Sequence, residues 1–419
     1  MLSNVTNLNL AGAELPEDFF EWLETAAVVH LNISNAKIDV PGEEWRWCGP
    51  RLEVLDISGL QLKKLRLTRG CNLRKLFAKD NQLESAFLDA PTLEAVDLDH
   101  NLFSDWLIIP LGTSLEKLET LSMSGNLLTS LPPGALTHFP LLQHLDLSRN
   151  QISNIEHDAF PSLGMQIISI DLSHNQLTSL PHPVLPSLLY LDISSNNLNE
   201  MSPLLFAGMP LLQHLKIGNN PEVFSKCGQK CWSDHVDVLT NLVDIDLSNC
   251  QISKPIDFSK SYSLKSISLR GNQITTLDGG LLPPTLSILD AGENLVHYTS
   301  NFSKRTGTLR DLRLDGNPLI CDCSLFEIRD QLLNQSRITD AASYYCFSSA
   351  WQHPLHPYLA SLRACLPSSS SILPSLVTAF LICVCIVLLI IISLIAAHRL
   401  CGSISYTYKR LALDIPVRL

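Results

Sequence analysis

The stretch Leu142–Ile152, LQHLDLSRNQI, places apolar residues at its first, fourth, sixth and last positions and an asparagine at its ninth. The same register recurs in LKSISLRGNQI (Leu264–Ile274) and LRDLRLDGNPL (Leu309–Leu319). Successive copies lie 20 to 30 residues apart, a period that indicates stacked structural repeats. The ninth position falls at Ala13, Ala36, Leu60, Asn81, Asn101, Asn126, Asn150, Asn175, Asn196, Asn220, Cys250, Asn272, Asn294 and Asn317.

This spacing predicts a coil built from short strands. Because side chains alternate along a strand, each L-x-L unit puts two apolar side chains on one face and the residue between them on the other. One repeat cannot bury its apolar face alone, so neighbours stack into a curved array. We therefore expect an α/β leucine-rich repeat solenoid of about 14 repeats over residues 1–319. It would be a horseshoe with a parallel sheet on its concave face.

The recurrent asparagine has a structural explanation. It stands where the chain leaves the strand, and its amide can satisfy backbone groups that the strand ladder does not reach. Cys250 takes this position in LVDIDLSNCQI and is expected to be a buried member of the same row.

Composition excludes several classes of function. The chain is 46% apolar and 17% charged, with a formal charge of -11. An acidic balance argues against a nucleic-acid partner, which needs a basic surface. The sequence has no G-x-S-x-G, H-E-x-x-H or phosphate-loop motif. We expect a binding protein without enzyme activity, cofactor or metal site.

Cysteines and glycosylation motifs favour an oxidising compartment. Nine of the 12 cysteines precede the most apolar segment of the chain. Four Asn-x-Ser/Thr motifs agree with this and predict glycosylation at Asn4, Asn32, Asn301 and Asn334.

Residues 372–397 are predicted to form one transmembrane helix. The stretch from Leu376 to Ala397 carries no charge and is long enough to cross a bilayer core of about 30 Å. Four basic residues follow it, whereas only Arg363 lies close before it. The positive-inside rule then predicts a type I plasma-membrane protein with its solenoid outside. Residues 366–371 would then be a stalk and residues 398–419 a short cytoplasmic tail.

The beginning of the sequence conflicts with this topology. MLSNVTNLNLAG already lies inside a repeat, without the basic and apolar regions of a signal peptide or a cap over the first coil. We expect that a signal peptide and an N-terminal cap are missing. The alternative is a chain that is never exported, which would be an intracellular leucine-rich repeat scaffold.

Residues 320–365 resemble the C-terminal cysteine cap of extracellular leucine-rich repeat proteins, read as N-P-x-x-C-x-C-x-L-x-x-L-x-x-W-L. Asn317, Pro318, Cys321, Cys323, Leu325, Ile328 and Leu332 match, and Gln331 replaces the usual Trp. The resemblance implies disulfides Cys321–Cys346 and Cys323–Cys365. A zinc site is the alternative, but no fourth ligand has a finger-like spacing.

The remaining cysteines allow two further disulfides, Cys48–Cys71 and Cys227–Cys231, if Cys250 is buried. The odd number leaves one thiol in any scheme. That thiol is either buried or forms an intermolecular bridge in a homo- or heterodimer.

The concave face is where this family usually binds ligands. We expect the residues between the two apolar positions of L-x-L to form that face, as an acidic stripe that steers a basic protein ligand. The alternative is that Asp is simply common there. His30, His144 and His214 lie on the same face and could make binding pH-sensitive. The stripe consists of Asp56, Asp97, Asp146, Asp171, Asp192, Lys216, Asp246, Asp290 and Arg313.

The solenoid, cap and single span resemble Toll-like receptors, but a tail of 22 residues is too short for a signalling domain. The chain looks more like the leucine-rich repeat receptors and co-receptors without that domain, and loosely like those that tether latent TGF-β. This implies a surface protein that binds a protein ligand, a receptor or a neighbouring cell, in adhesion, ligand presentation or co-reception. A truncated Toll-type innate immune receptor or decoy is the alternative.

Two features of the tail predict traffic and anchoring. Tyr408–Leu411 fits Y-x-x-Φ, similar to adaptor-binding endocytosis signals, and predicts endosomal cycling. Cys401 lies at the inner membrane boundary and is a palmitoylation candidate.

Overall fold

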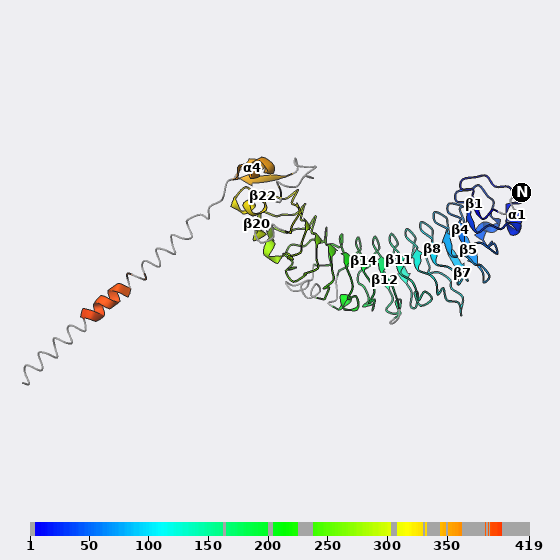
Figure 1. Cartoon of the computed structure of the whole chain (residues 1–419), viewed down its shortest axis with the longest axis horizontal. Helices are drawn as coiled ribbons and strands as arrows, with labels where there is room; N and C mark the ends of the chain where they lie inside the picture. Colours follow the sequence, from blue (N-terminus) through cyan, green and yellow to red (C-terminus); the bar gives the residue numbers. More distant parts are fainter. Residues whose placement is uncertain are drawn as a thin grey trace, which may run out of the picture. The chain divides into compact units, whose positions relative to one another are not determined.

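The computed structural model describes residues 5–161, 165–199, 204–224, 238–302, 308–329, 332, 344–348, 351–362, 382, 384 and 386–395. The chain divides into two units, Met1–Ser361 and Leu362–Leu419. Nearly all of the described structure belongs to the first unit, in which the coils of the repeats stack along an arc (Figure 1).

A parallel sheet of 14 strands runs the length of the first unit. Its strands β8, β11 and β14 lie on the inner side of the arc in Figure 1. From the second strand on, the middle residue of each strand is buried and its neighbours face away from the core, as the L-x-L pattern predicts. In order, the strands are β1 (Asn7–Asn9), β2 (His30–Asn32), β4 (Val54–Asp56), β6 (Lys75–Phe77), β8 (Ala95–Asp97), β9 (Thr120–Ser122), β11 (His144–Asp146), β13 (Ser169–Asp171), β14 (Tyr190–Asp192), β15 (His214–Lys216), β16 (Asp244–Asp246), β17 (Ser266–Ser268), β19 (Ile288–Asp290) and β21 (Asp311–Arg313).

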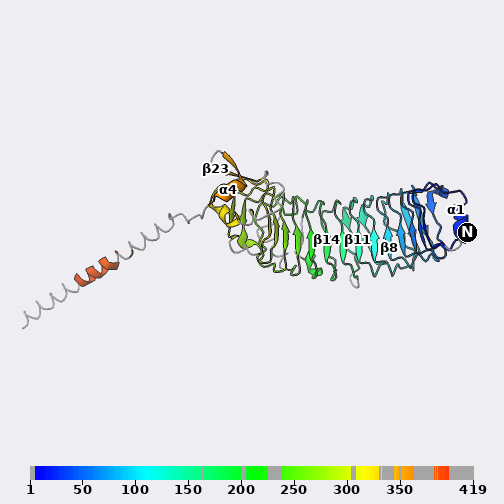
Figure 2. The same cartoon turned by 45° about the horizontal axis from the view of Figure 1, so that its top comes forward.

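The outer side of the arc carries short elements rather than one long sheet, and Figure 2 shows the coils from a second direction. The pairs β10–β12 and β18–β20 and the triplet β3–β5–β7 are all parallel. These elements are β3 (Glu44–Trp45), β5 (Lys64–Leu67), β7 (Ser85–Leu88), β10 (Ser130–Leu131), β12 (Asn154–Ile155), β18 (Thr276–Asp278), β20 (Tyr298–Ser300), and the 3-10 turns η1 (Pro41–Glu43), η2 (Leu205–Gly208) and η3 (Gly279–Leu281).

The recurrent asparagines form a buried ladder that joins each coil to the one before it. In Asn150, Oδ1 accepts a hydrogen bond from the Leu128 N–H at 3.0 Å. Its Nδ2 donates to the Met123 carbonyl of the preceding coil at 2.9 Å and to the Leu147 carbonyl of its own at 3.1 Å. Because a buried polar backbone group without a partner costs about 1–3 kcal/mol, each asparagine stabilises the stack. The members are Asn81, Asn101, Asn126, Asn150, Asn175, Asn196, Asn220, Asn272, Asn294 and Asn317.

Cys250 occupies one rung of this ladder and is a free, fully buried thiol. Its Sγ lies 3.3 Å from the Ser248 carbonyl and 3.7 Å from the Ile217 carbonyl, which are the acceptors that an asparagine amide would use. Burial raises the pKa of the thiol to about 12, so it stays protonated and acts as a weak donor.

The residue before each ladder position turns the chain in the left-handed conformation, with φ between 51° and 71°. Only glycine adopts this conformation without steric cost, and nine of the 14 positions carry another residue. The positions are Gly12, Asn35, Gly59, Asp80, His100, Gly125, Arg149, His174, Ser195, Asn219, Asn249, Gly271, Glu293 and Gly316.

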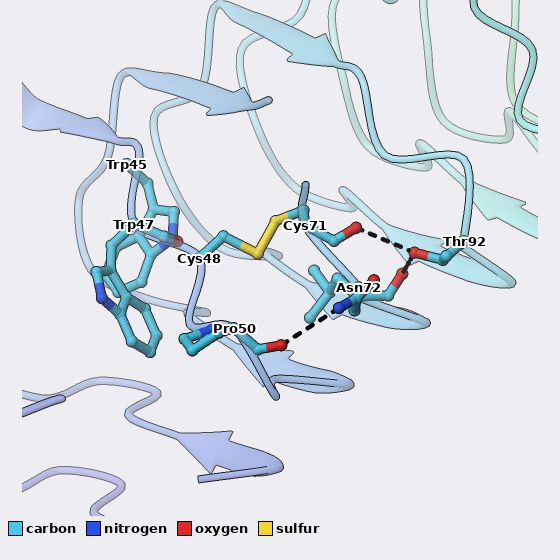
Figure 3. The surroundings of a disulfide bond; sticks show 8 residues. Trp45, Trp47, Cys48, Pro50, Cys71, Asn72 and Thr92 are labelled. Atoms are coloured by element: carbon cyan, nitrogen blue, oxygen red, sulfur yellow. Dashed lines mark hydrogen bonds between the residues drawn. A yellow bond between two sulfur atoms is a disulfide. The ribbon is translucent and has the colours of Figure 1, made fainter. Parts of the chain in front are cut away.

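The N-terminal coils contain an aromatic cluster beside a disulfide. Helix α1 (Phe19–Thr25) packs Phe20 against Trp45 with ring centroids 5.6 Å apart, and Trp45 meets Trp47 at 6.3 Å. The adjacent Cys48 is bonded to Cys71, one repeat further along (Figure 3). The bond ties the loop after β3 to the loop after β5.

The C-terminal end of the first unit has its own small sheet, in which β22 (Leu319–Ile320) pairs with β23 (Tyr345–Ser348) and β23 with β24 (Trp351–Pro354). Turn η5 (Cys323–Ile328) and helix α4 (Leu355–Ser361) complete it. A disulfide joins Cys321 to Cys346. Cys323 is also disulfide-bonded, and its predicted partner Cys365 lies outside the described residues.

In the second unit, residues 386–395 are helical. The predicted span at 372–397 lies largely outside the described residues. Among those that are described, no helix combines the length and the apolar character needed to cross a membrane.

Candidate functional site

The residues predicted to face a ligand all lie at one position of the sheet. Each is the last residue of its strand, where it projects from the inner face of the sheet. The strand register places Asp146, Asp171, Asp192, Lys216 and Asp246 side by side across β11 and β13–β16. At this position β6 has Phe77, and β9 and β17 have Ser122 and Ser268.

All seven of these aspartates also have a structural role that the sequence did not separate from binding. In each, Oδ1 accepts a hydrogen bond from the backbone N–H two residues later, as from Ser148 to Asp146 at 2.8 Å. This turn ends the strand and satisfies an N–H that the sheet does not pair. The donors to Asp56, Asp97, Asp171, Asp192, Asp246 and Asp290 are Ser58, Asp99, Ser173, Ser194, Ser248 and Gly292.

A cluster of aromatic and charged side chains lies at the middle of the sheet, on β14, β15 and β16. We call it the central concave cluster: Tyr190, Asp192, His214, Lys216, Asp244 and Asp246. The Tyr190 hydroxyl donates to Oδ2 of Asp192 at 3.1 Å, and Nζ of Lys216 lies 3.3 Å from the same oxygen. The Lys216 ammonium also sits 5.2 Å from the centroid of the Tyr190 ring. These contacts hold the aromatic ring and the cation in a fixed arrangement.

His214 extends the cluster towards β16. Its Nδ1 is 3.9 Å from Oδ2 of Asp244, and its ring centroid is 6.4 Å from that of Tyr190. Sequence reasoning identified Asp192, His214, Lys216 and Asp246 but missed Tyr190 and Asp244. These two are the first residues of their strands, where they face the same side as the third residue. The period-2 alternation could therefore have identified them.

Electrostatics distinguishes the cation of this cluster from its anions. The side-chain hydrogen bond with Tyr190 raises the pKa of Lys216, partial burial opposes the shift, and attraction by Asp192 adds to it. Burial raises the pKa of the Tyr190 hydroxyl. Burial likewise raises the pKa of Asp171, and repulsion from Asp192 and Asp146 adds to this against the hydrogen bonds from Ser173. Lys216 thus stays charged beside a crowded row of carboxylates.

A second charged network lies near the C-terminal end of the sheet. The Arg270 guanidinium donates to Asp315 at 2.6 Å and to Glu293 at 2.8 Å, and it lies 3.4 Å from Asp290. Arg313 lies 3.7 Å from the other oxygen of Asp290. The contact between Arg270 and Asp315 spans 45 residues of sequence. Sequence reasoning missed Arg270, Glu293 and Asp315 because they follow the strands rather than lie in them.

At the other end of the sheet, the inner surface has a hollow of about 260 Å³ on β1, β2, β4 and β6. We call it the N-terminal hollow. Leu8, Val54 and Phe77 supply apolar walls, and His30 and Asn32 supply polar ones. Of the two other predicted histidines, His144 begins β11 and His214 belongs to the central concave cluster.

Two of the four predicted glycosylation sites lie in the described part of the chain. Asn32 is half-buried in β2, and Asn301 is exposed directly after β20. Where residues are described, no group of three or more potential metal ligands occurs. The predictions that fall elsewhere concern Asn4, Asn334, Cys227, Cys231, Cys365, Cys401, Tyr408 and Leu411.

Comparison with known proteins agrees with this geometry. Residues 111–152 and 169–221 match the sequence profile described as leucine rich repeat. The matched segments coincide with coils that have the parallel strands and the asparagine ladder. The fold is a leucine-rich repeat solenoid.

The most similar curated proteins include receptors and other repeat proteins. The solenoid chain is 26% identical over 388 residues to Toll-like receptor 4 of Bos taurus, covering 88% of this chain and 41% of the receptor. It is 29% identical over 313 residues to podocan-like protein 1 of Mus musculus, covering 71% and 53%. It is 26% identical over 280 residues to keratocan of Danio rerio, covering 64% and 71%. The chain thus spans less than half of the length of the Toll-like receptor.

Solved structures share the same architecture. A leucine-rich repeat protein of Leptospira interrogans superposes with a TM-score of 0.59 at 21% identity, over 79% of this chain and 88% of that one. The Toll chain of the Drosophila Toll–Spatzle complex superposes with a TM-score of 0.53 at 18% identity, over 78% and 52%. At such identities the likeness is one of fold.

Proposed function

We propose that this protein is a single-pass type I cell-surface leucine-rich repeat protein without enzyme activity. Its inner sheet would bind a protein ligand or a protein on a neighbouring cell. The protein would act in adhesion, in ligand presentation or as a co-receptor. The observation that carries the proposal is the central concave cluster, because a rigid aromatic ring among fixed charges is typical of the energetic centre of a protein interface.

The chemistry of the cluster favours a basic partner surface. Lys216 is paired with Asp192, so Asp146, Asp171, Asp244 and Asp246 give the surrounding sheet a negative potential. A partner that presents lysine or arginine beside an apolar side chain would complement these carboxylates and the Tyr190 ring. Long-range attraction of this kind mainly raises the association rate and weakens as salt is added.

Three observations support an extracellular location. Disulfides at Cys48–Cys71 and Cys321–Cys346 form stably in oxidising compartments. The C-terminal sheet with its disulfides would act as the cap of the solenoid. The uncharged stretch within residues 372–397 would be the membrane anchor, followed by a cytoplasmic tail that carries the Tyr408–Leu411 sorting signal and Cys401 as a lipidation site.

The similarity to Toll-like receptors favours a second function, that of a Toll-type innate immune receptor or decoy. The Toll structure is that of a complex with the protein Spatzle, so a protein ligand is compatible with either function. The two differ in ligand class, because the decoy would bind microbial or self ligands that also engage a signalling receptor.

Topology is tested by a glycosidase mobility shift on the full chain expressed in cells, with and without an added signal peptide. A shift of either form of the protein supports the extracellular proposal. If neither form shifts, the result contradicts the extracellular proposal and favours an intracellular scaffold.

Binding is tested by cross-linking intact cells that display the full chain and comparing captured proteins between variants. Tyr190→Ala should lose the partner that the wild type captures, whereas Lys64→Ala, an exposed change on the outer strand β5, should retain it. Equal capture by both variants would remove the central concave cluster as the binding site.

A further inference from the structure

The N-terminal hollow has an aromatic side chain at a strand position where no other described strand of the inner sheet has one. At the strand position where most neighbours carry Asp, Lys or Arg, β6 carries Phe77, which is half-buried. The strand register aligns Asn32 with Asp56 and Asp56 with Phe77. An aromatic ring therefore faces the hollow two strands away from an asparagine in an Asn-x-Ser motif.

The amide of Asn32 is oriented for modification. Its Oδ1 accepts a hydrogen bond from the Ser34 N–H at 2.9 Å, which fixes the side chain. Its Nδ2 has no hydrogen-bond partner among the residues that the structure describes. Asn301 differs, because its Nδ2 donates to Oδ1 of Asp278 at 2.9 Å. Of these two predicted glycosylation sites, Asn32 presents the freer nitrogen.

Geometry brings a glycan on Asn32 over the hollow. Two strand spacings of about 4.8 Å separate Asn32 from Phe77, a distance that the asparagine side chain and its first sugars cover. The C–H face of a pyranose ring complements the negatively polarised face of an aromatic ring. Asp56 lies between the two, and its carboxylate oxygen that does not bind Ser58 can accept a hydrogen bond from a sugar hydroxyl.

We propose that an N-linked glycan on Asn32 occupies the N-terminal hollow, with its first sugars against Phe77. The glycan would cover β1, β2, β4 and β6 and leave the central concave cluster as the open protein-binding surface. The inference rests on the extracellular location in the proposed function. Attachment forms the bond between Nδ2 and the anomeric carbon of the sugar, breaks the bond from that carbon to a lipid-linked diphosphate donor, and releases one Nδ2 proton and the lipid diphosphate.

The first experiment measures where glycans are attached and how firmly they are seated. The full chain is expressed in mammalian cells behind a signal peptide, and glycopeptide mass spectrometry gives the occupancy of each motif. The native protein is then treated with peptide N-glycosidase. We expect occupancy at Asn32 and slower release there than at Asn301.

Two substitutions separate seating from attachment. Phe77→Asp introduces the residue that other strands carry at this position and keeps the Asn32 motif, and we expect release at Asn32 about fivefold faster, equivalent to ~1 kcal/mol. Phe77→Tyr keeps an aromatic ring and should release slowly, like the wild type. The release rate at Asn301 reports whether either variant has lost its fold.

Hydrogen exchange gives an independent measurement. Ser34→Ala removes the motif but keeps the backbone bond to Asn32, and it should raise exchange in residues 54–56 and 75–77. Ser303→Ala, which removes the Asn301 motif, should not. The inference would be overturned if Asn301 carried a glycan and Asn32 did not. It would also be overturned if Phe77→Asp left the release rate at Asn32 unchanged. Either result would leave the extracellular location intact. Absence of glycan from every motif would contradict both.

Discussion

Lys216 holds the carboxylate of Asp192 on the inner sheet, with Nζ 3.3 Å from Oδ2 and only 7% of the aspartate side chain exposed. The register puts Asp171 beside Asp192 on the neighbouring strand, so one cation offsets the repulsion within a row of carboxylates. The pair therefore links the stability of the central coils to the electrostatics of the proposed binding surface.

Replacing Lys216 with Met should destabilise the protein by about 1–2 kcal/mol. The change leaves the largely buried Asp192 carboxylate without its cation, which destabilises the folded state. The loss stays modest because the Lys216 side chain is partly exposed and solvent screens the pair. Chemical denaturation measures the free energy of unfolding. The double variant Asp192→Asn with Lys216→Met should recover much of the loss, and equal losses in the single and double variants would show that the charge pairing is not the cause.

Asn150→Ala should cost about 1–3 kcal/mol. The change leaves the buried Leu128 N–H without its partner, and one buried unpaired group costs about 1–3 kcal/mol. The carbonyls of Met123 and Leu147 keep a donor, because Nδ2 of Asn126 and of Asn175 also bind them. Gln151→Ala, the exposed neighbour, is the matched control and should change stability by less than about 0.5 kcal/mol. Thermal and urea unfolding of both variants measure the difference. Equal midpoints would show that this ladder asparagine does not contribute to stability.

Asp171→Asn should stabilise the protein at neutral pH and lose this effect in acid. The folded pKa of Asp171 is raised, so the folded state binds the proton more tightly than the unfolded state. The resulting cost is fully present above the folded pKa and disappears as pH falls below the unfolded value near 3.9. The asparagine Oδ1 can still accept the Ser173 N–H. Unfolding free energies measured across pH 3 to 8 test this, and a stabilisation that persisted in acid would point to a cause other than titration.

Gly271→Ala should destabilise by about 2–3 kcal/mol, more than Gly112→Ala. Both glycines have positive φ, 70° and 79°, which costs alanine about 1–2 kcal/mol. At Gly271 an added Cβ would also meet Oδ1 of Asn249, which accordingly has to move, whereas no atom lies near the Cβ position of Gly112. Differential scanning calorimetry of the two variants separates backbone strain from the clash, and equal losses would exclude the clash.

The period of about 24 residues allowed the sequence to predict the solenoid and its inner sheet, because each strand, turn and ladder position is defined within one repeat. Asn150 and Cys250 were recognisable as members of one row for the same reason. The alternation of side chains between the two faces of each strand also identified part of the central concave cluster.

Other relationships depend on the distance between coils, which local sequence does not encode. Arg270 reaches Asp315 because they lie on coils separated by a single coil, although they are 45 positions apart in sequence. The local sequence around each strand-end aspartate is the same whether its carboxylate binds a partner or its own backbone. Only the hydrogen bonds in the structure distinguish these two roles. Phe77 similarly acquires its relation to Asn32 from the register of three strands. Repeats thus determine the fold through local burial, whereas the site arises from side chains that stacking brings together.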